Sequence, residues 1–99
     1  MIHFVRTSSV APGKMADAIM FAKKIAAHLA KKPGIKVEVS VPVAGPPNRI
    51  SWYSQHRDLA EFETVMNKLN SDAEYAALLR EGPTLFLPGT TNDALWRSV

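Results

Sequence analysis

The chain opens with an alternation of apolar and polar residues. Over residues 2–9, Ile2 and Phe4 fall on one side of an extended backbone, whereas His3 and Val5 fall on the other. A period of two is typical of a β-strand with one buried face, so the pattern predicts a first strand over this segment. The turn-forming pair Pro12-Gly13 ends it.

A helical period replaces this alternation from residue 14 onward. The charged residues lie outside a single apolar stripe, so one face of the helix is predicted to pack on a core. Lys31 and Lys32 suit the negative end of the helix dipole, and Pro33-Gly34 ends the helix. The stripe consists of Met15, Ala18, Ile19, Ala22, Ile25, Ala26 and Leu29.

Two further strand-like segments follow, separated by the turn AGPPN. Residues 35–43 (IKVEVSVPV) carry their apolar residues at odd positions and predict a strand, with Pro42 at a strand end or edge because it cannot donate a ladder hydrogen bond. Residues 48–56 (NRISWYSQH) place Ile50 and Trp52 on one face. The two segments predict an antiparallel hairpin.

The last third of the chain predicts two helices and a final strand. Asp58 followed by Glu61 resembles a capping box, and Asp72 is the expected cap of a shorter helix that Gly82-Pro83 ends. The last strand is placed at residues 93–98. The residues expected to face inward are Leu59, Phe62, Met66 and Leu69 in the first of these helices and Tyr75, Leu78 and Leu79 in the second.

This order of elements, β-α-β-β-α-β, predicts an α+β fold of the ferredoxin-like type. We expect one domain over residues 1–99, with a four-stranded antiparallel sheet and helices on one face, because a chain of 99 residues supports one core. Pleat alternation then leaves the other face of the sheet open. The side chains expected there are His3, Val5, Glu38, Ser40, Arg49, Ser51, Tyr53 and Gln55.

Composition narrows the class of protein only slightly. Apolar residues make up 46% and charged residues 21%, an ordinary globular mixture, and the lack of cysteine excludes disulfides and thiolate metal sites. The net charge of +3 comes largely from lysines spread over the first helix, too sparse for a nucleic-acid footprint. Because there is no signal-like start and no apolar run of about 18 residues, we expect a cytoplasmic protein with no membrane or nucleic-acid partner.

Three segments of the chain resemble a known group of proteins. VRTSSVAPGKM, RISWYSQHRDLAEFE and FLPGTTNDALWRSV are similar to segments of the dimeric α/β-barrel superfamily, and within it of the NIPSNAP-like proteins and their small bacterial relatives. The resemblance covers nearly the whole chain. It implies a homodimer in which two open sheet faces pack into a barrel, with a ligand between sheet and helices or between the two sheets.

Five residues are the candidates for ligand binding on the open face. His3 would act as a proton donor, a ligand anchor or a haem ligand, or else only form a dimer contact. Arg49 and Tyr53 would hold an anionic or phenolic ligand, or else form an ordinary exposed pair. Glu38 would be a general base if a dimer buries it, and otherwise a solvated carboxylate. Trp96 would border the ligand, or close a core or a subunit interface.

Three functions remain open from the sequence. The first is a homodimeric protein that binds a small hydrophobic or aromatic ligand over the open sheet face. The second is a cofactor-independent monooxygenase or related small enzyme, for which Asn48, Trp52 and His3 are the only counterparts of a catalytic set. The third is a purely structural or assembly dimer. No cofactor and no metal is expected, because the three histidines lack paired spacing.

Overall fold

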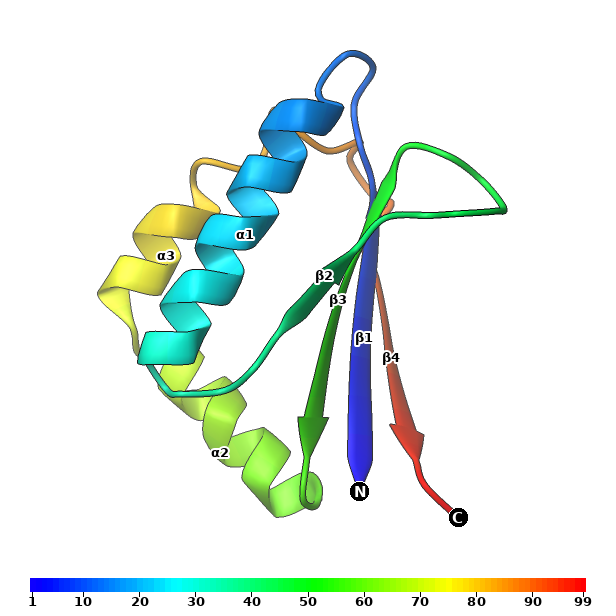
Figure 1. The fold of residues 1–99 in the computed structure, drawn as a ribbon. Coiled ribbons are helices and arrows are strands. Elements are labelled where there is room, and N and C mark those ends of the chain that lie inside the picture. The colour runs from blue at the N-terminus through cyan, green and yellow to red at the C-terminus, as the bar shows by residue number, and fades with distance from the viewer.

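The computed structural model describes residues 1–99 and contains one sheet with every helix on the same side of it (Figure 1). The strand order is β2-β3-β1-β4, and all neighbours are antiparallel. The predicted ferredoxin-like order is confirmed, and the second helical region consists of two successive helices, as predicted. The elements are β1 (Ile2–Ser9), α1 (Met15–Lys31), β2 (Glu38–Ser40), β3 (Arg49–His56), α2 (Leu59–Asn70), α3 (Ala73–Leu79) and β4 (Asn92–Arg97).

The register between β1 and β3 decides which side chains face the helices. Ile2 lies opposite His56 and Ser8 lies opposite Ile50, so the even-numbered residues of both strands share one face. Ile50 is fully buried on that face against α1. The odd-numbered residues, including Tyr53, therefore point to the open side, as the alternation of the sequence predicts.

The core lies between the sheet and α1. Ala18 and Ala22 are fully buried and let the helix approach the sheet closely at Ile50. Further along α1 the core widens into a second cluster. Phe21 belongs to it although it lies outside the predicted stripe, because its ring leans toward the segment that follows α3 and contacts Phe86. The five buried members of this cluster are Phe21, Ile25, Leu29, Val65 and Leu69.

Two residues predicted to face inward in the second half are more exposed than expected. Leu59 is 47% exposed, because it starts α2 just after the chain has left the end of β3, and Val65 is the buried residue of that helix. Leu79 is 42% exposed at the last position of α3. Tyr75 and Leu78, by contrast, pack against the core as predicted.

The second strand is shorter than the prediction of residues 35–43. Only Glu38–Ser40 pair with β3, which confirms the antiparallel hairpin but not its length. Val37 packs against the core without joining the ladder, whereas Val43 is fully exposed. An alternating sequence indicates which side chains are buried, but it does not indicate which residues pair with a neighbouring strand. A longer ladder would also require a backbone N–H at position 42, which proline lacks.

Both predicted helix caps are present. Asp58 Oδ1 accepts from the Glu61 N–H at 2.8 Å, and the Glu61 carboxylate accepts in return from the Arg57 N–H, which completes a capping box. Asp72 Oδ1 caps α3 by accepting from the Glu74 N–H at 2.9 Å. β4 begins one residue before its predicted start. No helix is long and apolar enough to cross a bilayer.

Replacing Ile50 with alanine should destabilise the fold by about 2–5 kcal/mol, because it opens a cavity where α1 meets the sheet. Met20→Ala is the matched control, since Met20 is 66% exposed on α1 and should change stability by less than about 0.5 kcal/mol. Urea unfolding followed by circular dichroism measures both. Equal losses for the two variants would contradict this description of the core.

Candidate functional site

A cavity of about 580 Å³ lies between the sheet and the helices. Its floor is the helix-facing side of β1 and β3, and its walls come from α1, α3 and the segment that joins α3 to β4. A volume of this size accommodates a small organic ligand. Its aromatic lining residues are Phe4, Phe21, Trp52, Tyr53, Tyr75 and Phe86.

The segment after α3 shapes the cavity. Phe86 lies 5.8 Å from Phe21 and 5.8 Å from Trp52 between ring centroids, so this segment is tied to both the helix layer and the sheet. Gly82 lies directly against the Phe21 ring: a Cβ at this position would be 2.8 Å from the ring. Any larger residue here would force the Phe21 ring to shift, and the turn predicted at Gly82-Pro83 also positions a cavity wall.

One buried polar atom of a cavity-lining residue lacks a partner, although the atom itself is sealed from the cavity. The indole nitrogen Nε1 of Trp52 is buried and forms no hydrogen bond. A buried donor left unpaired costs about 1–3 kcal/mol, and proteins contain few of them. Sequence reasoning placed Trp52 beneath the helices but gave no signal that its N–H would be unpaired.

Arg6 adds a charge at the edge of the same cavity. Its Nε and Nη2 atoms donate to the two carboxylate oxygens of Asp93 at 2.7 and 2.8 Å, which joins β1 to β4. This ion pair raises the pKa of Arg6 and lowers the pKa of Asp93. The two side chains are 39% and 44% exposed, so the pair lies where the cavity meets solvent.

Two further polar groups line the cavity. Burial raises the pKa of Tyr75, so its phenol stays protonated to a higher pH than usual. Ser54 Oγ lies 2.8 Å from His56 Nε2, and both residues are almost fully buried. Burial lowers the pKa of His56, which keeps the imidazole neutral.

The first and third helices are joined by a buried contact beside the cavity. His28 Nε2 lies 2.7 Å from Asp72 Oδ2, and the His28 ring stacks on Tyr75 at 6.3 Å between centroids. The hydrogen bond to His28 lowers the pKa of Asp72, with smaller contributions from backbone amides of α3. His28 is not among the residues that the sequence singles out, and the predicted cap at Asp72 was the one available signal.

The five predicted ligand-binding residues all lie on the open face, opposite the cavity. His3 Nδ1 lies 2.6 Å from the Tyr53 hydroxyl, which also accepts from Gln55 Nε2 at 2.8 Å. His3 Nε2 lies 2.6 Å from Ser98 Oγ. Because the Tyr53 oxygen already accepts from Gln55, we assign its hydroxyl as the donor to Nδ1, which places the proton of His3 on Nε2, where it is donated to Ser98 Oγ.

The other three of these residues lie around that network without joining it. Glu38 is opposite Tyr53 in the sheet and within 3.6 Å of the Lys36 ammonium. Arg49 Nε donates to the Pro46 carbonyl at 3.3 Å. Trp96 lies opposite His3 and is 65% exposed. Only Tyr53 of the five also borders the cavity.

The residues considered for monooxygenase chemistry do not form one site. Trp52 faces the helices, whereas His3 lies on the opposite face of the sheet. Asn48 has a φ of 56° in the turn before β3, and its carbonyl accepts from the Val10 N–H at 2.7 Å. Pleat alternation separates Trp52 from His3, so the sheet itself prevents this trio from meeting.

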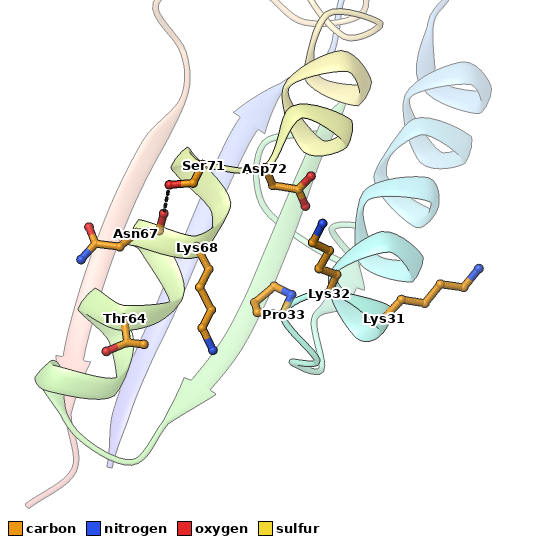
Figure 2. A pocket seen from close by; sticks show the side chains of 8 residues that line it. All are labelled: Lys31, Lys32, Pro33, Thr64, Asn67, Lys68, Ser71 and Asp72. Carbon is orange, nitrogen blue, oxygen red and sulfur yellow. Dashed lines mark hydrogen bonds between the residues drawn. The ribbon is translucent and has the colours of Figure 1, made fainter.

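A second cavity, of about 660 Å³, lies between the C-terminal ends of α1 and α2 (Figure 2). None of its lining residues is hydrophobic, and three of them are Lys31, Lys32 and Lys68. Their amines do not converge: Lys31 points away from the others, and Lys32 points toward Asp72. Lysines at helix C-termini offset the helix dipole, so we assign them that role rather than anion binding.

Known proteins relate to the chain through structure and not through sequence. No family model and no curated protein sequence matches it. A NIPSNAP domain protein from Burkholderia xenovorans has a TM-score of 0.85 at 11% identity, over 100% of this chain and 95% of its own. A NIPSNAP family protein from Agrobacterium tumefaciens has a TM-score of 0.82 at 16% identity, over 99% and 92%. The chain has the NIPSNAP-type fold.

The same fold occurs in a protein described as an enzyme. An antibiotic biosynthesis monooxygenase has a TM-score of 0.75 at 10% identity, over 100% of this chain and 99% of its own. At such identities the likeness shows the fold alone. The predicted resemblance to NIPSNAP-like proteins of α/β-barrel type is therefore confirmed as a fold, and the NIPSNAP-type similarity assigns no activity.

The buried His56 should make stability depend on pH. Because its pKa is lowered in the folded chain, the unfolded chain binds the proton more readily, and stability falls as the pH drops below the ordinary value of 6.5. Above that value the contribution is complete. His56→Gln should flatten this part of the curve of unfolding free energy against pH, measured by urea unfolding between about pH 5 and 8. An unchanged slope in the variant would rule out His56 as the titrating group.

Proposed function

We propose that this protein binds a small, largely apolar aromatic ligand in the cavity between the sheet and the helices. The cavity itself carries the proposal: 14 of its 23 lining residues are hydrophobic, and rings from β1, α1 and β3 surround it. Pockets that hold small organic molecules have this composition, an apolar wall with a few placed polar groups. An aromatic ligand would pack against Trp52 and Phe86 in offset or edge-to-face contacts.

We favour binding over proton-transfer catalysis because the ionisable groups in and beside the cavity are already held by other side chains. Asp93 is held by Arg6 with a lowered pKa, which makes it a weak base. His56 is neutral but is already bonded to Ser54. A monooxygenase function therefore remains an alternative that rests on fold likeness, and no residue of this cavity specifically favours it.

The proposed site differs in place from the open-face site that the sequence suggested. On the open face, His3, Tyr53 and Ser98 satisfy one another, and Arg49 bonds to a backbone carbonyl. These groups offer few free donors to a ligand. The helix-facing side of the same strands offers an enclosed volume with a mostly apolar lining.

Binding of naphthalene-sized aromatic probes, measured by calorimetry and thermal shift, tests the cavity. Leu79→Trp should abolish binding, because the larger ring fills the cavity from α3. Leu95→Trp is the matched control: Leu95 is similarly exposed, on β4, but does not line the cavity. If no probe stabilises the wild type, or if both variants bind equally well, the ligand does not occupy this cavity.

We also propose that two copies of the chain associate through the open sheet face. No helix covers this face, and Trp96 is 65% exposed on it beside His3. Tryptophan is enriched at subunit interfaces relative to the rest of a protein surface. A dimer would bury this ring together with the hydrogen-bonded network of His3 and Tyr53.

The oligomeric state tests the association directly. Trp96→Asp should weaken the dimer by at least about tenfold, because it places a charge within the proposed contact. Leu95→Asp, next to it in β4 but on the other face of the sheet, should leave the association unchanged. Sedimentation equilibrium measures both variants. A monomeric wild type at high concentration would overturn the proposal.

A further inference from the structure

The two edges of the sheet differ in how well they are protected against pairing with another strand. At one edge, β2 is only three residues long and is followed closely by Pro42, which cannot donate a ladder hydrogen bond. At the other edge, β4 has six residues, contains neither proline nor lysine, and exposes every residue except Ala94. Only β1 pairs with β4, so its outer side is an open edge.

The backbone hydrogen bonds determine which groups of β4 point outward. The Ser98 N–H donates to the Met1 carbonyl at 3.0 Å, so these two residues form a hydrogen-bonded pair at the end of the ladder. Hydrogen-bonded and non-hydrogen-bonded pairs alternate along antiparallel strands. The even-numbered residues of β4 are therefore bonded to β1, and the backbone N–H and C=O groups of Asp93, Leu95 and Arg97 point to the open edge.

These three residues form a pattern that complements itself. If a second copy of β4 lies antiparallel to the first with Leu95 facing Leu95, then Asp93 of each copy faces Arg97 of the other. Each of these facing residues directs its N–H and C=O toward the other strand, so every pair exchanges two hydrogen bonds. Centring the pairing on any other residue of β4 no longer places Asp93 opposite Arg97.

The side chains of β4 favour the same arrangement. Arg97 is exposed and forms no ion pair within its own chain. A charge that points to the inner face often protects an edge strand, but Arg6 already neutralises Asp93 through two hydrogen bonds. The carboxylate has further lone pairs that can accept from Arg97 of a second copy. Leu95, which is 48% exposed, would become partly covered by its own counterpart.

We propose that the outer edge of β4 is a second interaction surface, which pairs with β4 of another copy of this chain in antiparallel register centred on Leu95. The pairing is two-fold symmetric and extends the sheet across both copies. The open sheet faces stay uncovered, so this contact is independent of the open-face association proposed above. Both contacts together would give a tetramer.

The register is tested by joining the two strands at their centre. The chain has no cysteine, so Leu95→Cys introduces a single thiol. In the proposed pairing the two Cα atoms at position 95 would be about 5.5 Å apart. Dibromobimane, which joins two neighbouring thiols, should therefore give a covalent dimer on a denaturing gel. Val43→Cys is the control for random collision: Val43 is fully exposed outside β4, and its thiol should remain largely unjoined.

The charge pairing has its own variant. Arg97→Glu places a carboxylate opposite Asp93 twice in each symmetric pair, so it should weaken the edge contact by about tenfold or more in sedimentation equilibrium. It should also reduce the cross-linked fraction when combined with Leu95→Cys. Lys23→Glu changes the net charge equally on an exposed position of α1 and should leave both measurements unchanged.

A backbone variant separates strand pairing from a side-chain contact. Leu95→Pro removes an N–H that β1 does not use, so the chain should fold normally by circular dichroism but lose the edge contact. Leu95→Ala keeps this N–H and should weaken the contact much less. Equal behaviour of the two variants would show that the strands do not pair through their backbones.

The outcomes separate this inference from the proposed open-face association. A wild type that forms only a dimer, with no cross-link at position 95, overturns the edge contact and leaves the open-face association standing. A dimer that is joined at position 95 and is insensitive to Trp96→Asp supports the edge contact and overturns the open-face association. A tetramer that Leu95→Asp reduces to a dimer supports both, since that variant places two carboxylates opposite each other at the edge. A monomeric wild type overturns both.

Discussion

The register between β1 and β3 determines which side chains lie on each face of the sheet. Ser8 lies opposite Ile50 and Arg6 lies opposite Trp52, which places the cavity floor and the buried core on one side. A slip of one residue would turn Trp52 toward the open face and bring Tyr53 beneath α1. The full burial of Ile50 against Ala18 and Ala22 opposes that slip, because it would put the polar Arg49 or Ser51 in the place of Ile50.

Much of the fold could be predicted from the sequence because burial has a period. The alternation in residues 2–9 and 48–56 predicted the strands and also which side chains face the helices. This is possible because apolar and polar residues alternate along a strand that is buried on one face only. The caps at Asp58 and Asp72 were recognisable because a cap depends on neighbours in the chain. The length of β2 was not, since ladder pairing depends on a partner strand and on the course of the loop around Pro42.

The candidate site was less predictable, for a related reason. The cavity depends on contacts between distant segments: Phe86 meets both Phe21 and Trp52, and Gly82 fits against the Phe21 ring. No periodic pattern and no local motif in the sequence indicates these contacts. The sequence did identify Trp52 and Tyr53 as pointing to opposite faces, but composition alone drew attention to the polar face, because side chains such as Arg49 and His3 carry recognisable chemistry.

A buried polar group without a hydrogen-bond partner has a large effect on the stability of a domain of this size. Folded domains are stable by only about 5–15 kcal/mol, so one unpaired buried donor, at about 1–3 kcal/mol, consumes a substantial part of that margin. Phenylalanine at position 52 would provide a similar aromatic surface without the unpaired N–H. Asp93, in contrast, satisfies Arg6 completely enough to remove its charge from the cavity edge. Arg6 therefore brings no net charge to the cavity edge, and strand β3 carries the proposed binding cavity on one face and the proposed subunit contact on the other.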